Sequence, residues 1–117
     1  MIFSESLKNN KDFKKVYSKG KSCANKYLVM YILKNDQEKN RVGISVSKKV
    51  GNSIIRHRLT RLIRESYRLN EEKFSKGYDI VVIARFGARE KKCQEIEKAL
   101  LHLGKLHHII DGQMELH

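Results

Sequence analysis

The fold of this chain is decided by residues 41–68, which read RVGISVSKKVGNSIIRHRLTRLIRESYR. The first seven residues alternate between apolar and small side chains, a pattern typical of a β-strand with one face against a core. Helical spacing begins near Asn52 or Ser53, and both residues are good N-caps. A further apolar run follows at residues 78–85. The sequence therefore predicts a βαβ unit whose two strands pair in parallel.

The predicted helix separates basic from apolar side chains. With Arg56 at zero and about 100° per residue, the basic side chains cover roughly 80° to 200° and the apolar ones roughly 220° to 340°. The basic set is Arg64, His57, Arg68, Arg61 and Arg58, and the apolar set is Leu69, Leu62, Ile55, Leu59 and Ile63. We expect the apolar face to enter the core and the basic face to meet a partner.

This segment also concentrates the positive charge of the chain. Residues 48–68 hold seven Lys and Arg residues and one acid, Glu65, so their net charge is +6 (7 − 1), half of the chain's +12. No Glu lies four residues before a Lys or Arg to relieve the repulsion between like charges. A merely solvated face is the alternative, but it has to explain why the stripe is almost all Arg, a residue that can pair two phosphate oxygens at once. The sequence therefore favours nucleic acid as the partner.

Composition limits the class of protein. The chain has 117 residues, 40% of them hydrophobic, and a pI of about 9.9, which fits one folded domain with anionic partners. No apolar run approaches the roughly 20 residues of a membrane span, and the first residues lack a secretory signal. We therefore expect a cytoplasmic protein without membrane contact. Cys23 and Cys93 are expected to be buried or half-buried thiols.

The remaining elements follow from apolar periodicity. We expect helices at residues 10–17 and about 90–108, and a strand at residues 26–34 that a polar turn connects to the next strand. With the βαβ unit, the element order is α-β-β-α-β-α: one α+β domain with a small mixed sheet packed by helices. The strand at residues 78–85 is apolar on both faces and should be interior. Residues 111–117 are expected to be frayed.

The strand at residues 41–47 carries a second pattern. Its apolar side chains alternate with Gly43, Ser45 and Ser47, which have almost no bulk. A sheet face of small polar groups is either ordinary solvent exposure or the floor of a groove. The sequence alone leaves both interpretations open.

The chain lacks the residue patterns of a protein nuclease. Two-metal hydrolysis needs clustered carboxylates, but the four Asp residues are scattered, and neither a metal-binding His motif nor a complete phosphate loop is present. His57 lies among cations and has no carboxylate to orient it. We therefore predict no catalytic residue and no metal site in the protein.

Residues 41–65 closely resemble the signature of the bacterial ribonuclease P protein subunit, approximately R-x-G-[IL]-S-V-S-K-K-x-G-N-A-x-x-R-N-R-x-K-R-x-I-R-E. The match extends to residues 10–17, 24–25 and 80–85, and so covers nearly the whole chain. Two residues depart from the pattern. His57 stands where the family has Asn, and Thr60 stands where Lys or Arg is common. The family's basic N-terminal extension is also largely missing.

The resemblance implies that the protein is a subunit of a ribonucleoprotein that removes the 5′ leader of precursor tRNA. A catalytic RNA with bound Mg²⁺ would perform the hydrolysis. The protein, a monomer within the complex, would bind that RNA and the precursor tRNA through one RNA-binding domain over residues 1–117. The resemblance also implies a left-handed βαβ crossover, against the general rule.

Two sets of residues take family roles under this resemblance. The residues expected to contact the catalytic RNA are Lys48, Asn52, Arg56, His57, Arg58, Arg61, Arg64 and Arg68. Those expected to hold the leader are Phe13, Tyr17 and Tyr31 as a stacking wall, Ser45, Ser47 and Lys49 as a floor, and Arg85 at the edge. Base–aromatic stacking tolerates any leader sequence, but the three aromatics fit a core role equally well.

Three other functions compete with this interpretation. A structural, ribosomal-type RNA-binding protein with no role in tRNA processing would use the same helix. A DNA-binding module is disfavoured because a strand, not a helix, precedes the basic helix. A protein-only nuclease is opposed by the missing carboxylate cluster.

Overall fold

The computed structural model describes residues 4–110, and strand β5 (Tyr78–Ala84) lies at its centre. β5 pairs in parallel with β4 (Asn40–Ser45) and antiparallel with β3 (Leu28–Lys34). Residues 80–82 of β5 are fully buried, although their side chains point to both faces of the sheet. The predicted two-sided interior strand is therefore confirmed.

Two short edge strands complete a five-stranded mixed sheet with the order β1-β4-β5-β3-β2. β1 (Ser4–Ser6) pairs in parallel with β4, and β2 (Lys21–Ala24) pairs antiparallel with β3. The predicted α-β-β-α-β-α order is present, but the sequence did not predict β1 or β2. Segments of three and four residues are too short to establish an alternating pattern. Residues 111–117, expected to be frayed, lie outside the described residues.

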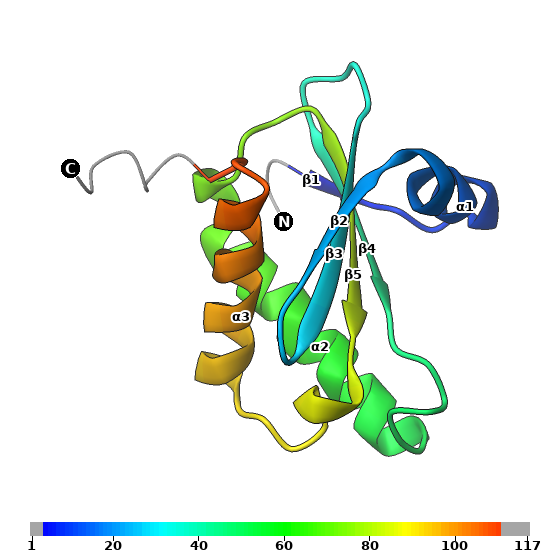
Figure 1. Cartoon of the computed structure of the whole chain (residues 1–117), viewed down its shortest axis with the longest axis vertical. Coiled ribbons are helices and arrows are strands. Elements are labelled where there is room, and N and C mark those ends of the chain that lie inside the picture. Colours follow the sequence, from blue (N-terminus) through cyan, green and yellow to red (C-terminus); the bar gives the residue numbers. More distant parts are fainter. Residues whose placement is uncertain (1–3, 111–117) are drawn as a thin grey trace.

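Within residues 4–110, three α-helices cover the two faces of the sheet, as Figure 1 also shows. They are α1 (Asn10–Lys19), α2 (Ser53–Asn70) and α3 (Cys93–Leu106). α2 and α3 lie on one face, in a core that includes Met30 and Val82. α1 lies on the opposite face, where Val16 and Val81 belong to a second, smaller core. Helical turns η1 (Glu71–Lys73) and η2 (Phe86–Ala88) flank β5 in the sequence.

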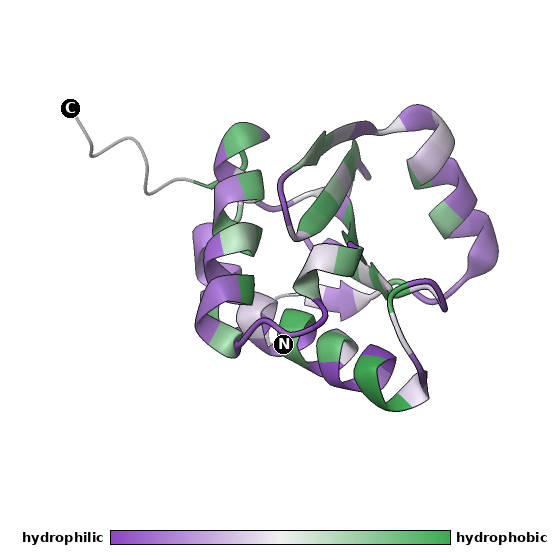
Figure 2. Cartoon of the chain, turned by 60° about the horizontal axis from the view of Figure 1, so that its bottom comes forward, coloured by the Kyte–Doolittle hydropathy of each residue, from purple (hydrophilic) through white to green (hydrophobic). Residues whose placement is uncertain are grey.

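The buried face of α2 differs from the predicted one. Leu59 and Ile63 are buried as expected, but Leu69 is 57% exposed, and Tyr67 is fully buried instead. The ring of Tyr67 packs 5.0 Å from that of Phe74, and its hydroxyl lies 2.8 Å from the Ser4 hydroxyl. Phe74 directly follows η1 and Ser4 begins β1, so helical periodicity within α2 could not reveal these partners. Figure 2 shows apolar and polar residues alternating along α2.

A network of charged side chains connects α1 to the sheet. Arg41 of β4 donates to both carboxylate oxygens of Asp79, at 2.9 and 2.6 Å, and to Asp12 of α1 at 3.3 Å. The Asp79 side chain is only 4% exposed and also accepts from Asn35 at 3.0 Å. The hydrogen bond with Asp79 raises the pKa of Arg41 above its usual value. The guanidinium therefore stays charged and holds β4, β5 and α1 together.

Replacing Asp79 with Asn should destabilise the protein strongly, because Arg41 would lose its two short charged hydrogen bonds in a mostly buried position and keep only the 3.3 Å contact with Asp12. We expect the free energy of unfolding to fall by about 3 kcal/mol, near the lower end for a broken buried pair. Urea denaturation followed by circular dichroism measures this change.

The matched control is Glu5→Gln, which removes the exposed 3.4 Å ion pair between Lys39 and Glu5. It should change the free energy of unfolding by less than about 1 kcal/mol. Equal effects of the two substitutions would contradict a structural role for the Arg41–Asp79 pair.

Candidate nucleic-acid interface

The outward face of α2 presents the first candidate surface. The helix begins after Asn52, whose side chain accepts a hydrogen bond from the Ile55 amide at 3.0 Å. His57, Arg61 and Arg64 are exposed, and none of the three forms an ion pair within residues 4–110. They surround a shallow concavity of about 710 Å³ that Arg58, Glu65, Ile54 and Leu62 also line. The two guanidinium groups and the imidazole are therefore free to meet an external polyanion.

Three other arginines of the predicted set interact within the protein. Arg56 is half-buried, and its Nε donates to the Gly51 carbonyl at 3.2 Å. Arg58 donates to the backbone carbonyls of Arg89 and Lys91 at 3.2 and 2.5 Å. Helical periodicity cannot predict the contacts of Arg58, because its partners lie more than thirty residues away in the sequence.

Arg68 is paired with the one acid of the stripe. Its guanidinium donates to both carboxylate oxygens of Glu65, each at 2.7 Å. This hydrogen bonding raises the pKa of Arg68 and lowers the pKa of Glu65. The prediction that no acid compensates the basic stripe is therefore wrong at the C-terminal end of α2. There Glu65 pairs with Arg68, three residues further along the helix. The free positive charge lies in the first two-thirds of α2.

The turn from β4 to α2 extends the basic surface. Lys48 and Lys49 are exposed there, and the preceding Ser47 is also exposed. Because β4 and β5 are parallel, their carboxyl ends lie at one edge of the sheet, which brings Ser45 and Arg85 to the same end of the molecule. The Arg85 guanidinium donates to the Asn25 carbonyl at 2.7 Å.

The second candidate surface is a groove between α1 and the sheet. Gly43 permits a close approach of α1 to β4, because a Cβ at this position would lie 2.5 Å from Cζ of Phe13. A shallow groove of about 340 Å³ opens beside this contact. Its lining residues are Asn10, Phe13, Lys14, Tyr17, Ile44 and Ser45. The small-residue face of β4 is therefore partly covered by α1 and partly a groove floor.

The three predicted aromatic residues form one connected group. The ring centroids of Phe13 and Tyr17 are 6.2 Å apart, and those of Tyr17 and Tyr31 are 5.1 Å apart at an interplanar angle of 73°. Tyr17 is 39% exposed, whereas Phe13 and Tyr31 also pack against the smaller core. Partial burial raises the pKa of Tyr17, although its hydrogen bond with Ser45 opposes the shift. Tyr17 therefore presents a neutral phenol to the groove.

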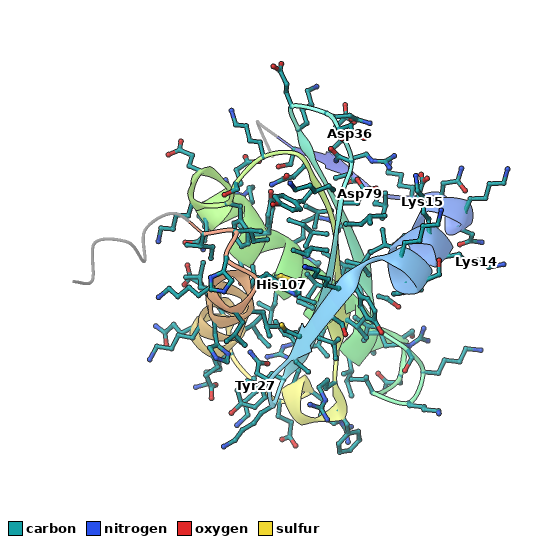
Figure 3. The ribbon with its side chains drawn as sticks, turned by 45° about the horizontal axis from the view of Figure 1, so that its top comes forward. Lys14, Lys15, Tyr27, Asp36, Asp79 and His107 are labelled. Carbon is teal, nitrogen blue, oxygen red and sulfur yellow. The ribbon has the colours of Figure 1, made fainter. Side chains whose placement is uncertain are left out.

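The structure brings together only part of the predicted leader site. Phe13, Tyr17 and Ser45 line the groove, whereas Tyr31, Ser47, Lys49 and Arg85 do not. Lys14 and Asn10 line it without having been predicted. Asn10, Lys14 and Tyr17 lie four and three residues apart, so helical spacing could have identified the two additional residues. Figure 3 shows Lys14 and Lys15 projecting outward from α1.

The other predicted features concern metals, thiols and membranes. Within residues 4–110, no group of three or more His, Cys, Asp or Glu side chains could hold a metal ion. Cys23 and Cys93 are half-buried and free, as expected. No helix in the described part of the chain is long and apolar enough to cross a membrane.

Comparisons with known proteins agree on one family. Residues 2–107 match the family model of Ribonuclease P. The ribonuclease P protein component of Lachnoclostridium phytofermentans is 63% identical over 109 residues, covering 93% of this chain and 94% of the relative. That of Clostridioides difficile is 55% identical over 103 residues, covering 87% of this chain and 90% of the relative.

Solved structures give the same result. The RNase P protein of Staphylococcus aureus has a TM-score of 0.84 at 36% identity, covering 92% of this chain and 99% of that chain. The RNase P protein of Thermotoga maritima has a TM-score of 0.80 at 34% identity, covering 86% of this chain and 96% of that chain.

Arg58 and Arg61 should differ in their effect on stability. Replacing Arg58 with Ala removes two charged hydrogen bonds to backbone carbonyls and should cost about 1 kcal/mol. Replacing Arg61 with Ala removes no hydrogen bond or ion pair seen within residues 4–110 and should change stability by less than about 0.5 kcal/mol. Thermal denaturation of the two variants tests this difference, and equal melting temperatures would show that Arg58 does not hold the loop at residues 89–91.

Proposed function

Because the chain belongs to the ribonuclease P protein family, we propose that it binds two RNAs through two separate surfaces. The protein is a subunit of an endoribonuclease that matures the 5′ end of tRNA. The outward face of α2 binds the catalytic RNA, and the groove beneath α1 binds the 5′ leader of precursor tRNA. The observation that carries this proposal is the placement of α1 and α2 on opposite faces of one sheet (Figure 1).

The α2 face has the chemistry of a phosphate-binding surface. Exposed guanidinium groups pair phosphate oxygens in a planar fork, and they surround a concavity that can receive an RNA backbone. Lys48 and Lys49 continue the positive charge beyond the start of the helix. His57 is exposed among these residues and can donate to a phosphate or ribose in place of the family's Asn. Binding of this kind releases counterions and weakens as salt rises.

The groove has the chemistry of a single-strand site. Tyr17 and Phe13 offer ring surfaces on which unpaired bases can stack, and stacking accepts any base. Lys14 supplies a positive charge beside the rings for the leader phosphates. Ser45 forms a small polar floor, so the backbone of a strand can approach the sheet closely. These properties suit leaders of differing sequence.

Hydrolysis is assigned to the RNA subunit and the Mg²⁺ that it binds. The supporting observation is the arrangement of acidic side chains within residues 4–110, which form no metal-binding group. Asp12 and Asp79 pair with Arg41 and serve the fold. We place this function in the cytoplasm and assign one protein monomer to each complex.

The purified protein, free of RNA, should not cleave precursor tRNA in the presence of Mg²⁺. Adding the catalytic RNA should produce mature 5′ ends, because the proposal places the chemistry in that RNA. A gel-based cleavage assay measures both reactions. Specific cleavage by the protein alone would contradict the assignment of hydrolysis to the RNA.

Replacing Arg61 and Arg64 with Ala should weaken binding to the catalytic RNA. The slope of log K against log salt should become shallower by about one for each lost phosphate contact. Filter binding at several salt concentrations measures this slope. The matched control replaces Lys98 and Lys105 of α3 with Ala, which removes the same charge from another helix. Similar slopes for the two double variants would show that α2 is not the RNA-binding face.

Replacing Tyr17 with Ala should lower affinity for precursor tRNA with a leader of several nucleotides, at a cost of about 1–3 kcal/mol. Affinity for mature tRNA should not change, because mature tRNA has no leader to stack. Phe13→Ala and Tyr31→Ala test the other two rings, and Tyr17→Phe should retain binding.

Thermal denaturation of each variant is the control for this experiment. If the alanine variants melted much lower and lost both tRNA ligands alike, the aromatics would be core residues and the leader site would lie elsewhere. A ribosomal-type RNA-binding protein would not distinguish precursor from mature tRNA at all.

A further inference from the structure

An exposed aromatic residue lies outside both surfaces, directly after the central strand. Phe86 begins the helical turn η2 and is 61% exposed. It belongs to neither hydrophobic core of the described chain. The guanidinium carbon of Arg89 lies 5.1 Å from the centroid of its ring. This pair presents a flat apolar surface together with a positive charge.

A second aromatic residue and a second cation adjoin this pair. Lys91 Nζ lies 5.1 Å from the centroid of the half-buried Tyr27 ring and 3.7 Å from Glu95. A Cβ at Gly87 would lie 3.7 Å from Cδ1 of Tyr27, so η2 passes close to this ring. Figure 3 shows Tyr27 at the end of the molecule where η2 lies. Exposed Arg85 and Lys26 add charge to this end, and Glu90 is the exposed acid in the same loop.

The backbone around Phe86 is held in place. The Arg89 amide donates to the Phe86 carbonyl at 3.2 Å, and the Ala88 amide donates to the Arg85 carbonyl at 2.9 Å. Ala88 is fully buried. Arg58 of α2 donates to the carbonyls of Arg89 and Lys91. The backbone that carries the exposed ring is therefore anchored to the first half of α2 through Arg58, and Figure 1 shows η2 beside that half of the helix.

We propose that Phe86 and Arg89 form a stacking site for an unpaired base of the catalytic RNA. This inference rests on the proposed function, since it extends the RNA-binding surface of α2 onto η2. An aromatic ring and a planar guanidinium are the groups on which single-stranded bases stack. The bonds from Arg58 connect the η2 loop to the α2 side of the molecule. The groove for the leader opens on the opposite side of the sheet, so the catalytic RNA is the RNA that reaches Phe86.

The test compares substitutions that separate stacking from apolar contact. Phe86→Leu keeps an apolar side chain but removes the aromatic face, and Phe86→Trp keeps a larger aromatic face. Binding of the catalytic RNA to the full-length protein is measured without precursor tRNA. Phe86→Leu should weaken binding about fivefold or more, and Phe86→Trp should bind at least as well as the wild type. Leu106→Ala, an exposed leucine at the end of α3, is the control and should not change binding.

Footprinting of the catalytic RNA supplies the second measurement. Phe86→Leu should expose one or a few unpaired nucleotides while the protection near α2 persists. Unchanged melting temperature is expected for all variants, because Phe86 lies outside the cores. Equal affinity and equal footprints of Phe86→Leu and the wild type would overturn the proposal. A loss of affinity confined to leader-bearing precursor tRNA would also overturn it, because the site would then belong to the substrate.

The double variant Arg61→Ala/Arg64→Ala distinguishes this inference from the function on which it rests. If that variant binds the catalytic RNA weakly while Phe86→Leu binds normally, only the stacking site is rejected. If neither variant weakens binding, the assignment of α2 to the catalytic RNA fails together with the stacking site.

Discussion

The parallel pairing of β4 with β5 is the constraint on which the rest of the structure depends. Parallel neighbours cannot be joined by a tight turn, so the chain must cross over the sheet in a connection of a dozen or more residues. In this protein the crossover contains α2, which places its apolar side in the main core and its basic side outward. The same pairing brings the carboxyl ends of both strands to one edge, where the turn to α2 and the turn η2 both begin.

The sheet then separates two surfaces of different chemistry. On one side, α2 presents the guanidinium groups of Arg61 and Arg64, which pair with no acid within residues 4–110, and the exposed imidazole of His57 lies beside them. On the other side, α1 lies so close to β4 that Phe13 occupies the space of a side chain at Gly43. The Arg41 network fixes that distance by joining α1 to both central strands. The proposed function uses this separation, since it assigns a structured RNA to one surface and a flexible strand to the other.

Sequence patterns predicted the central elements because each of them carries its own periodicity. The interior strand, the capped basic helix and the small-residue face of β4 all follow from spacing within one segment. The features that were missed depend on partners distant in the sequence. Tyr67 takes the core position expected for Leu69 because Phe74 and Ser4 contact it. Arg58 stays exposed but bonds to two loop carbonyls that lie within its reach. Likewise, the ion pair of Arg68 with Glu65 was missed because the sequence was searched only for an acid four residues before a basic residue, and these two are three residues apart.

The central claim is that α1 and α2 contact different RNAs in one complex. Site-specific photocrosslinking in the assembled complex of protein, catalytic RNA and precursor tRNA tests this claim most directly. A photoreactive amino acid replaces either Lys14, in the groove, or Arg64, on the outward face of α2. The account predicts crosslinks from position 14 to the 5′ leader and from position 64 to the catalytic RNA. Crosslinks from both positions to the same RNA, or from position 14 to the catalytic RNA alone, would contradict it.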